Sequence, residues 1–341
     1  MTSTSRVGVL FNEATKSDWG EDVDYISAAE VLEQAEAVQE ALRKLGFEYQ
    51  AFMLKDDVGS LILGLKSYRP DVVINLCEGA FGDSHLEMNV PCLLELLRIP
   101  YTGSPPLTLG ICQNKGLTKD ILKSNGIPTP RYQVLESFSD WRGEINYPLF
   151  VKPLKEDASL GISRESFVRS DVELRNRVEY LVEHYEQPVL VEEYVEGREL
   201  NISILGNEQP EALPISEIVF DFSEERPKIV DYSAKWIKES EEYKKTSPVC
   251  PANLDPHTRE KVETTALSAY KVVHCRDYAR VDIRLRNGIP YVLEVNPNPD
   301  ISPETGFARS TRVAGIPFEE FVKKIVSFAL ERNRERRKSG G

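Results

Sequence analysis

The stretch from Ala279 to Asp300 constrains the fold of this chain most, because it reads as two short strands joined by a turn at Asn287-Gly288. Asn-Gly between apolar runs is a strong signal for a tight hairpin turn, and side chains alternate between the two faces of a strand. We therefore expect one apolar face, with Val281, Ile283, Leu285, Leu293 and Val295, and one polar face, with Arg280, Asp282, Glu294 and Asn296.

The polar face has the composition of a ligand site. If the register aligns its residues, two carboxylates and a carboxamide converge, and these are hard oxygen ligands of the kind that Mg²⁺ takes while it bridges phosphates. The neighbouring arginine suits a phosphate or an oxyanion. The prolines of Asn296-Pro297-Asn298-Pro299-Asp300 end the second strand in a rigid loop, since proline cannot continue a ladder. A solvated hairpin face is the competing interpretation, and the prolines favour ligand binding.

Composition excludes several classes of protein. A chain of 341 residues should hold two or three domains. Its net charge of −13 argues against nucleic acid and anionic membranes as partners, so a polyanionic substrate would need locally placed lysine, arginine or metal. No apolar run approaches the roughly 18 residues of a membrane span, and the N-terminus has no signal pattern. The five scattered cysteines indicate free thiols. We therefore expect a cytoplasmic protein.

Strands and helices alternate through the first hundred residues, which predicts a parallel open sheet. The expected segments are strands at 6–11, 47–54 and 70–76 and helices at 28–45, 61–68 and 86–97. Ligands of such sheets bind at the carboxyl ends of the strands, so residues 12–30 and 75–83 form the predicted rim. Pro105-Pro106 is the first predicted domain boundary.

The rest of the chain contains further helices and strands and one candidate phosphate-binding loop. Lys115 lies on a predicted helix and Lys152 at the end of a predicted strand. The loop 155–163 has small residues that could cover phosphates with backbone N–H groups. Residues 229–243 should begin as a strand and continue as a mobile, lysine-rich loop. Other expected elements are helices at 108–125, 172–184, 255–274 and 318–330, strands at 147–153 and 167–168, and two strands within 188–205.

These pieces, in this order, resemble the ATP-grasp superfamily, and within it the D-alanine–D-alanine ligase family. The resemblance covers about residues 6 to 330 and rests on LLRIPYTGS at 96–104, Val151-Lys152-Pro153, the run 189–199, and the pairs Arg280-x-Asp282 and Glu294-x-Asn296. It implies an α/β (mixed α+β) fold that clamps ATP. The predicted division is an N-terminal parallel-sheet substrate domain, two ATP-grasp subdomains and a frayed polar tail, at residues 1–104, 105–187, 188–331 and 332–341.

The resemblance also implies an activity: ATP phosphorylates a carboxylate, and an amine attacks the acyl phosphate to give an amide and ADP. By this resemblance Arg280 would stabilise the oxyanion and, with Lys235 and Ser159, be catalytic. Two Mg²⁺ ions, or Mn²⁺, would bind Asp282, Glu294 and Asn296, and the family commonly forms homodimers. ATP would contact Lys115, Lys152, Ser159, Glu192, Glu193, Val195, Glu199 and Lys235.

The departures from the family pattern fall on the amino-acid pocket. The family's GSS-x-G loop reads Asp157-Ala158-Ser159-Leu160-Gly161, and its lysine–tyrosine pair reads Lys235-Trp236. Its GG-x-S-x-E segment is absent, which leaves Glu30 as the nearest candidate for the substrate amine. Its N-x-x-P-G-[MF]-T motif reads Asn296-Pro297-Asn298-Pro299-Asp300-Ile301-Ser302. The remaining substrate candidates are Glu78 at the rim, Trp236, and Thr305 with Gly306 at the position of a carboxylate-binding serine.

The sequence therefore predicts a ligase that joins a carboxylate to an amine through an altered pocket. An authentic D-alanine–D-alanine ligase of cell-wall synthesis is the alternative within the family. A non-catalytic ATP-binding protein, and an enzyme whose acceptor is a thiol or hydroxyl, also remain open.

Overall fold

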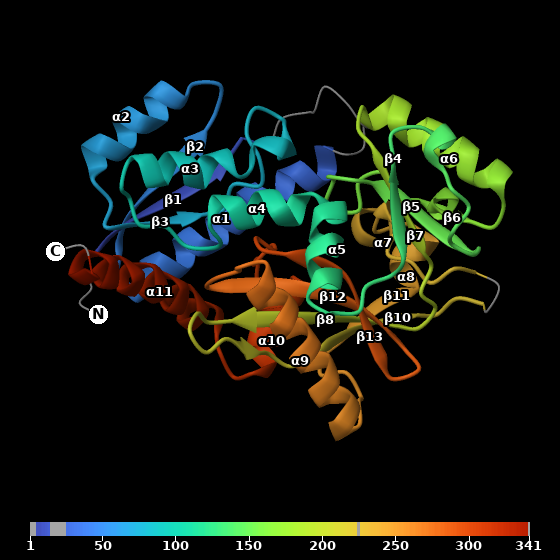
Figure 1. Cartoon of the computed structure of the whole chain (residues 1–341). Helices are drawn as coiled ribbons and strands as arrows, with labels where there is room; N and C mark the ends of the chain where they lie inside the picture. Colours follow the sequence, from blue (N-terminus) through green and yellow to red (C-terminus); the bar gives the residue numbers. More distant parts are fainter. Residues whose placement is uncertain (1–4, 14–24, 224–225, 340–341) are drawn as a thin grey trace.

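The strands of the computed structural model, which describes residues 5–13, 25–223 and 226–339, form three separate sheets. The first has the order β2-β1-β3, the second β4-β7-β5-β6, and the third β11-β10-β8-β12-β13 with β9 paired to β8. The three sheets occupy different parts of the molecule, with α4 and α5 between them (Figure 1). The predicted mixed α/β class is confirmed.

The N-terminal sheet is parallel, as the alternating pattern predicts. The apolar stripe of α1, with Val31, Ala35, Val38 and Leu42, is buried, whereas Leu32 at its margin is 36% exposed. Residues 14–24 of the predicted rim lie outside the described residues. This part contains β1 (Arg6–Asn12), α1 (Tyr25–Leu45), β2 (Glu48–Leu54), α2 (Val58–Tyr68), β3 (Val72–Asn75), the short helix η2 (Ser84–Leu86) and α3 (Asn89–Leu96).

The single helix expected over 108–125 is in fact two helices, α4 (Pro106–Gln113) and α5 (Lys115–Ser124). Asn114 separates them: its backbone is extended, and its side chain caps α5 by accepting from the Leu117 N–H at 3.0 Å. A side-chain oxygen that satisfies a free N–H of the first turn stabilises a helix start. The break places Lys115 at the first position of α5.

The second sheet is antiparallel and includes a strand that the predicted division assigned to the third domain. Strand β7 (Val189–Glu193) pairs with β4 (Tyr132–Leu135), which was not predicted, and with β5 (Leu149–Pro153). The division into domains therefore remains a prediction, with β7 on the side of the central sheet. The sheet is completed by β6 (Phe167–Val168), and α6 (Asp171–Tyr185) packs on it.

The predicted hairpin is confirmed as β12 (Tyr278–Arg286) and β13 (Ile289–Asn296). Asn287 and Gly288 both have positive φ, 51° and 72°, the backbone that a type I′ turn requires and that glycine adopts at little cost. The register pairs Arg280 with Asn296 and Asp282 with Glu294, so the polar residues do align.

One face assignment in the hairpin was wrong. The register shifts at Asp282/Ile283, and this β-bulge adds a residue to β13, which changes the alternation. Val292 and Val295 therefore pack in the core cluster with Val281 and Ile283, whereas Leu293 does not belong to it. The third sheet also contains β8 (Arg198–Leu205), β9 (Glu211–Ala212), β10 (Ser216–Phe220) and β11 (Thr246–Val249), and α9 (Pro256–Val272) covers it.

The segment predicted to begin as a strand and continue as a loop instead forms two short helices, α7 (Tyr232–Trp236) and α8 (Glu241–Lys244). Asp231 starts α7 because its side chain accepts from the Ala234 N–H at 2.8 Å. In this helical turn the side chains of Lys235 and Trp236 are in contact: the Lys235 Nζ lies 4.5 Å from the centre of the Trp236 ring system.

The polar tail predicted at 332–341 is also corrected, because α11 (Phe318–Ser339) continues through most of it. Arg332 forms an ion pair with the buried Asp277. Helix α11 packs on α1 and shares its apolar core, and the two lie together beside the N-terminal sheet (Figure 1). The last helix before it is α10 (Gly306–Val313). Among the helices described, none is long and apolar enough to cross a membrane.

Candidate active site

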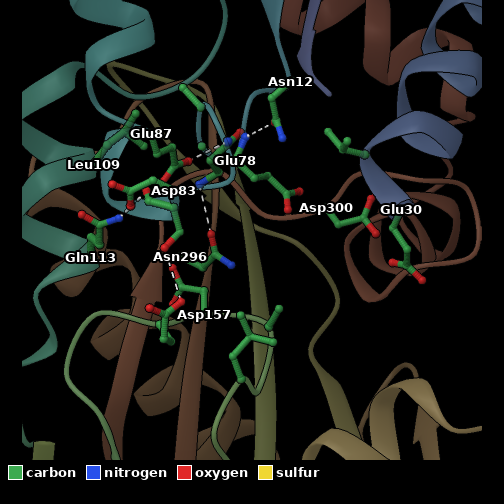
Figure 2. A pocket seen from close by; sticks show the side chains of 18 of the residues that line it. Asn12, Glu30, Glu78, Asp83, Glu87, Leu109, Gln113, Asp157, Asn296 and Asp300 are labelled. Atoms are coloured by element: carbon green, nitrogen blue, oxygen red, sulfur yellow. Dashed lines mark hydrogen bonds between the residues drawn. The ribbon is translucent and has the colours of Figure 1, made fainter. Parts of the chain in front are cut away.

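A pocket of about 170 Å³ lies where the end of β13 meets the loop after β3 and the loop 155–161 (Figure 2). Its lining combines residues from all three parts of the fold. Six of the predicted site residues line it: Glu30, Glu78, Lys235, Trp236, Arg280 and Asn296.

The polar face of the hairpin forms one wall of the site. The Arg280 guanidinium donates twice to the Asp282 carboxylate, from Nε to Oδ1 and from Nη2 to Oδ2, both at 2.8 Å. Asn201, on the neighbouring strand β8, donates to the same Asp282 Oδ1 at 2.7 Å. A two-pronged contact of this kind fixes the plane of the guanidinium. Arg280 is thus held in one orientation at the pocket wall.

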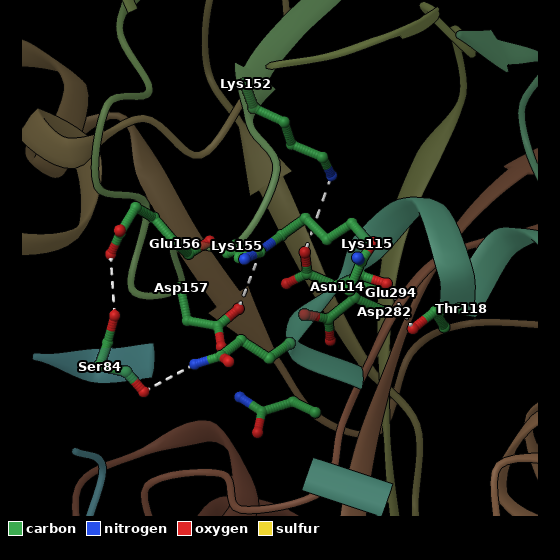
Figure 3. A network of polar contacts seen from close by, with 12 residues as sticks. Ser84, Asn114, Lys115, Thr118, Lys152, Lys155, Glu156, Asp157, Asp282 and Glu294 are labelled. Atoms are coloured by element: carbon green, nitrogen blue, oxygen red, sulfur yellow. Dashed lines mark hydrogen bonds and ion pairs between the residues drawn. The ribbon is translucent and has the colours of Figure 1, made fainter. Parts of the chain in front are cut away.

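A buried charge cluster joins the central sheet to the hairpin. Glu192 lies 2.7 Å from the Lys119 Nζ and 3.2 Å from the Lys152 Nζ, and Lys152 also approaches Glu294 at 3.7 Å (Figure 3). Burial opposes the charge on Glu192, but the two lysines outweigh it and lower its pKa. Lys119 is fully buried. Glu192 already pairs with both lysines. If Glu192 also accepted a hydrogen bond from adenine, its carboxylate oxygens would be shared between adenine and the lysines.

Glu294 has the charge state that a metal ligand needs. Burial would raise the pKa of Glu294, but Lys152, Lys115 and Arg280 outweigh it and hold the pKa at about 2. The carboxylate faces Asp282 across the hairpin.

The predicted ligands of a divalent cation are the side-chain oxygens of Asp282, Glu294 and Asn296. The described residues contain no group of three or more His, Cys, Asp and Glu side chains arranged for a metal. The predicted set has only two carboxylates and the Asn296 carboxamide, and its hard oxygens suit Mg²⁺ when phosphate oxygens complete the shell. Asp282 Oδ2 keeps a lone pair beyond its contact with Arg280, whereas Oδ1 accepts from both Arg280 and Asn201. The residues present therefore fit the ion.

The predicted adenosine contacts lie on β7, β8 and the turn between them. Glu199 pairs with Arg284 at 2.6 Å, directly across the β8–β12 register. The Glu193 carboxylate pairs with Arg286 at 2.7 Å, and its N–H donates to the Arg131 carbonyl. The adenine ring cannot accept a hydrogen bond from the Glu193 N–H unless the bond from that N–H to the Arg131 carbonyl is broken. Val195 is buried.

The loop 155–163 is tied to the segment that carries Lys235. The Trp236 Nε1–H donates to the Ala158 carbonyl at 2.8 Å, and the Ser159 hydroxyl donates to the Val230 carbonyl at 3.1 Å. Lys115 donates to the Glu156 carbonyl and lies 3.2 Å from the Asp157 carboxylate. These contacts hold the predicted phosphate loop against its neighbours.

Two neighbouring residues of the same loop have a strained backbone. Ala158 and Ser159 have φ values of 54° and 63°, a left-handed conformation that costs a non-glycine residue about 1–2 kcal/mol. Strain of this kind clusters at ligand-binding sites. The conformation agrees with the predicted phosphate-covering role, which stays a prediction.

The opposite wall of the pocket is acidic. Burial, the charge of Asp300 and a hydrogen bond that protonated Glu30 donates to Asp300 raise the pKa of Glu30 to about 7, although Lys235 opposes the shift. Burial and the charge of Asp300 likewise raise the pKa of Glu78 to about 8. Burial raises the pKa of Glu87 to about 8 despite a hydrogen bond from Asn298. The carboxyl groups on this wall therefore bind protons near neutral pH.

The acidic wall should make the stability of the protein depend on pH. Because the pKa of Glu78 is about 8 in the fold and near 4.5 when unfolded, the folded state holds the extra proton, and stability falls as pH rises from about 4.5 to 8. We expect Glu78→Gln to leave the free energy of unfolding nearly unchanged at pH 5 and to raise it by on the order of 2 kcal/mol at pH 8. Urea unfolding at both pH values measures this.

The exposed Glu208 provides the matched control, since Glu208→Gln should change stability little at either pH. An equal effect of Glu78→Gln at both pH values would contradict the prediction.

Two predicted substrate residues lie outside this pocket. The Thr305 hydroxyl donates to the carbonyls of Asp300 and Ser302, at 3.0 and 2.8 Å, and Gly306 starts α10; neither is among the lining residues. Thr305 therefore holds the loop that carries Asp300. Residues that sequence reasoning missed are Asn201 and Lys119, whose partners are distant in the chain, and Asp300 as a lining residue.

The comparisons with known proteins give the family. The model of the D-ala D-ala ligase C-terminus matches residues 121–327. The chain belongs to the D-alanine–D-alanine ligase family. It is thus an ATP-grasp enzyme, an ADP-forming ligase that makes C–N bonds.

The similarity extends over nearly the whole chain. A D-alanine–D-alanine ligase of Thermotoga petrophila is 34% identical over 302 residues, with 88% of this chain and 92% of that protein covered. An uncharacterized protein of Sinorhizobium fredii, y4sG, is 31% identical over 306 residues, covering 87% and 88%. A crystal structure of the Bacillus anthracis D-alanine–D-alanine ligase complexed with ATP superposes with a TM-score of 0.76 at 26% identity, covering 97% of this chain and 99% of that one.

Proposed function

We propose that this ligase joins a carboxylate to an amine through an acyl phosphate, with an amino-acid pocket altered from that of D-alanine–D-alanine ligation. The observation that supports this is the pocket itself, because Arg280 and Asn296 line it together with Glu30, Glu78 and Asp300. A reactive side and an amine-binding side thus face the same small space.

The proposed reaction has two steps. A carboxylate oxygen of the first substrate attacks the γ-phosphorus of ATP, and ADP leaves. The amine of the second substrate then attacks the carbonyl carbon, the nitrogen loses a proton, and the C–O bond to phosphate breaks. Positioning and charge stabilisation should supply most of the barrier reduction.

The residues of this chain have distinct tasks in that reaction. Arg280, fixed by Asp282, stabilises the negative charge that develops on the carbonyl oxygen. Lys115, Lys152, Ser159 and Lys235 bind phosphate oxygens. Asp282, Glu294 and Asn296 hold two Mg²⁺ ions, which, when bound, neutralise the charge of the transferred phosphate.

Further assignments rest on the family. Glu192, Glu193, Val195 and Glu199 bind the adenosine part of ATP, and Trp236 packs at the substrate side, where it lines the pocket. We also infer a homodimer in the cytoplasm, which is supported by similarity to the family alone.

The alternative within the family is D-alanine–D-alanine ligation, which the identity to the Thermotoga petrophila ligase supports. Against it stand the altered loop at Ala158, Trp236 in place of the family's tyrosine, and Asp300 in the pocket wall. A site rebuilt at several polar positions can discriminate between substrates by about 10⁴-fold.

ADP release with Mg²⁺, ATP and a panel of single and paired amino acids tests the proposal. We expect a carboxylate–amine pair other than two D-alanines to give the highest kcat/KM. Turnover driven by D-alanine alone would support the alternative. ATP binding without substrate-dependent ADP release from any pair would contradict ligase activity itself.

A further inference from the structure

The acidic wall of the pocket contains more carboxyl groups than one substrate amine would pair with. Glu30 from α1, Glu78 after β3 and Asp300 after β13 lie together at one side of the pocket (Figure 2). Over the described residues, no lysine or arginine forms an ion pair with any of them within 4.0 Å, whereas most other carboxylates of the site have one. The nearby cation that acts on Glu30 and Glu78 is Lys235.

The shortage of positive charge appears in the protonation of these groups. The pKa of Glu30 is raised to about 7 and that of Glu78 to about 8, by burial first and by Asp300 second. Glu30 and Asp300 also share a hydrogen bond. Glu30 and Glu78 thus bind protons near neutral pH because no further cation lies beside them to stabilise their charged forms.

Asp300 is a departure of this chain from the family motif. In the family motif quoted above, its position is a glycine, so a carboxylate has been added to the pocket. Its Oδ1 accepts from the Ser302 N–H at 2.8 Å and from the Ser302 hydroxyl at 2.7 Å. These bonds fix the Asp300 side chain and leave its other oxygen, Oδ2, for Glu30 and the pocket.

The three acids line the same pocket as Arg280 and Asn296, which the proposed function assigns to the substrate. A substrate ammonium group can therefore reach them. The volume of about 170 Å³ is below the 300–1,000 Å³ of pockets for drug-sized ligands. It suits a molecule of amino-acid size.

We propose that the acid substrate of this ligase carries a second ammonium group, which binds between Glu78 and Asp300 while Glu30 holds the α-ammonium. The substrate class is therefore the diamino acids. The inference rests on the proposed function and narrows it. The carboxylate of such a substrate would face Arg280 and Asn296 across the pocket.

The test compares each diamino acid with a neutral isostere: ornithine with norvaline and lysine with norleucine, in both configurations, each with a range of amine partners. ADP release is measured with Mg²⁺ and saturating ATP. We expect kcat/KM to be at least about tenfold higher for the diamino acid, the effect of one charge contact of about 1.4 kcal/mol. Equal kcat/KM for both members would overturn the inference and leave the proposed function intact.

Asp300→Asn isolates the charge, because asparagine keeps an oxygen that can accept from Ser302. It should lower kcat/KM for the diamino acid about tenfold more than kcat/KM for the isostere. Glu78→Gln should act in the same direction, and Glu208→Gln on the exposed surface should change neither value. An equal loss for both substrates in Asp300→Asn would indicate a structural role and overturn the inference.

Two further outcomes separate the sources of failure. If an aliphatic diamine is preferred as the amine partner while a neutral amino acid supplies the carboxylate, the second ammonium belongs to the amine substrate and the assignment to the acid is overturned. If no acid stimulates ADP release with any amine, the proposed function fails together with the inference.

Discussion

Replacing Arg280 with methionine is expected to lower kcat about 10²–10³-fold at saturating ATP, with little change in the KM for ATP. The guanidinium lines the pocket and is fixed by two 2.8 Å hydrogen bonds to Asp282. A preorganised donor aimed at developing negative charge contributes this much to catalysis. Methionine has a similar length, and Asn201 still donates to Asp282, so the wall should keep its shape.

Steady-state ADP release measures the effect of Arg280→Met. The control is Arg259→Met at an exposed arginine of α9, which should retain wild-type kcat. A variant that unfolds at the wild-type temperature and retains kcat within threefold would show that Arg280 does not stabilise the transition state.

Glu294→Gln should lower kcat by about 10²-fold and raise the Mg²⁺ concentration needed for half-maximal activity. Glutamine keeps the size of the side chain but removes a charge that Lys152, Lys115 and Arg280 hold in place with a pKa of about 2. A neutral carboxamide is a weaker ligand of a hard cation than a carboxylate. The defect should be larger at low Mg²⁺ than at high Mg²⁺.

The Mg²⁺ dependence separates a metal ligand from a residue that only balances Lys152. Titration of Mg²⁺ at fixed ATP is compared with Glu260→Gln, at an exposed glutamate of α9, which should match wild type. A Glu294→Gln variant with lower kcat but an unchanged Mg²⁺ requirement would remove Glu294 from the metal site.

The hairpin was predictable because its information is local. Alternation along β12 and β13 and the Asn287-Gly288 turn determine which residues align, and the structure pairs Asp282 with Glu294 as expected. The bulge was not predictable, since an extra residue leaves the sequence pattern intact and is set by the pairing of the strands. That is why Leu293 was assigned to the wrong face.

Elements that depend on distant contacts were the ones missed. The helix breaks at Asn114, between α4 and α5, where the Lys115 N–H donates to the distant Leu154 carbonyl at 3.2 Å. The continuation of α11 through the expected tail is anchored by Arg332 on Asp277, 55 positions away in the chain. Propensity is a weak guide where such tertiary contacts decide.

The residues of the site also fall into two sets: some have a signal in the local sequence, and others depend on contacts with distant parts of the chain. The alignment of Asp282 with Glu294 was predictable from alternation along the two strands, whereas Lys152 was singled out by the family resemblance of Val151-Lys152-Pro153. Lys119 was not, because a second lysine one turn after Lys115 reads as a surface charge, and only its burial against Glu192 gives it a role. The acidic wall depends on Asp300 and Glu30, which the chain brings together from opposite ends.

Transfer of ¹⁸O from a labelled substrate carboxylate to inorganic phosphate tests the central claim most directly. In the acyl-phosphate route a carboxylate oxygen attacks the γ-phosphorus and leaves with the phosphate. The account predicts that, with Mg²⁺ and ATP, each amide formed releases ADP and a phosphate that contains a single labelled oxygen. Amide formation with unlabelled phosphate, or with AMP and pyrophosphate as products, would contradict it.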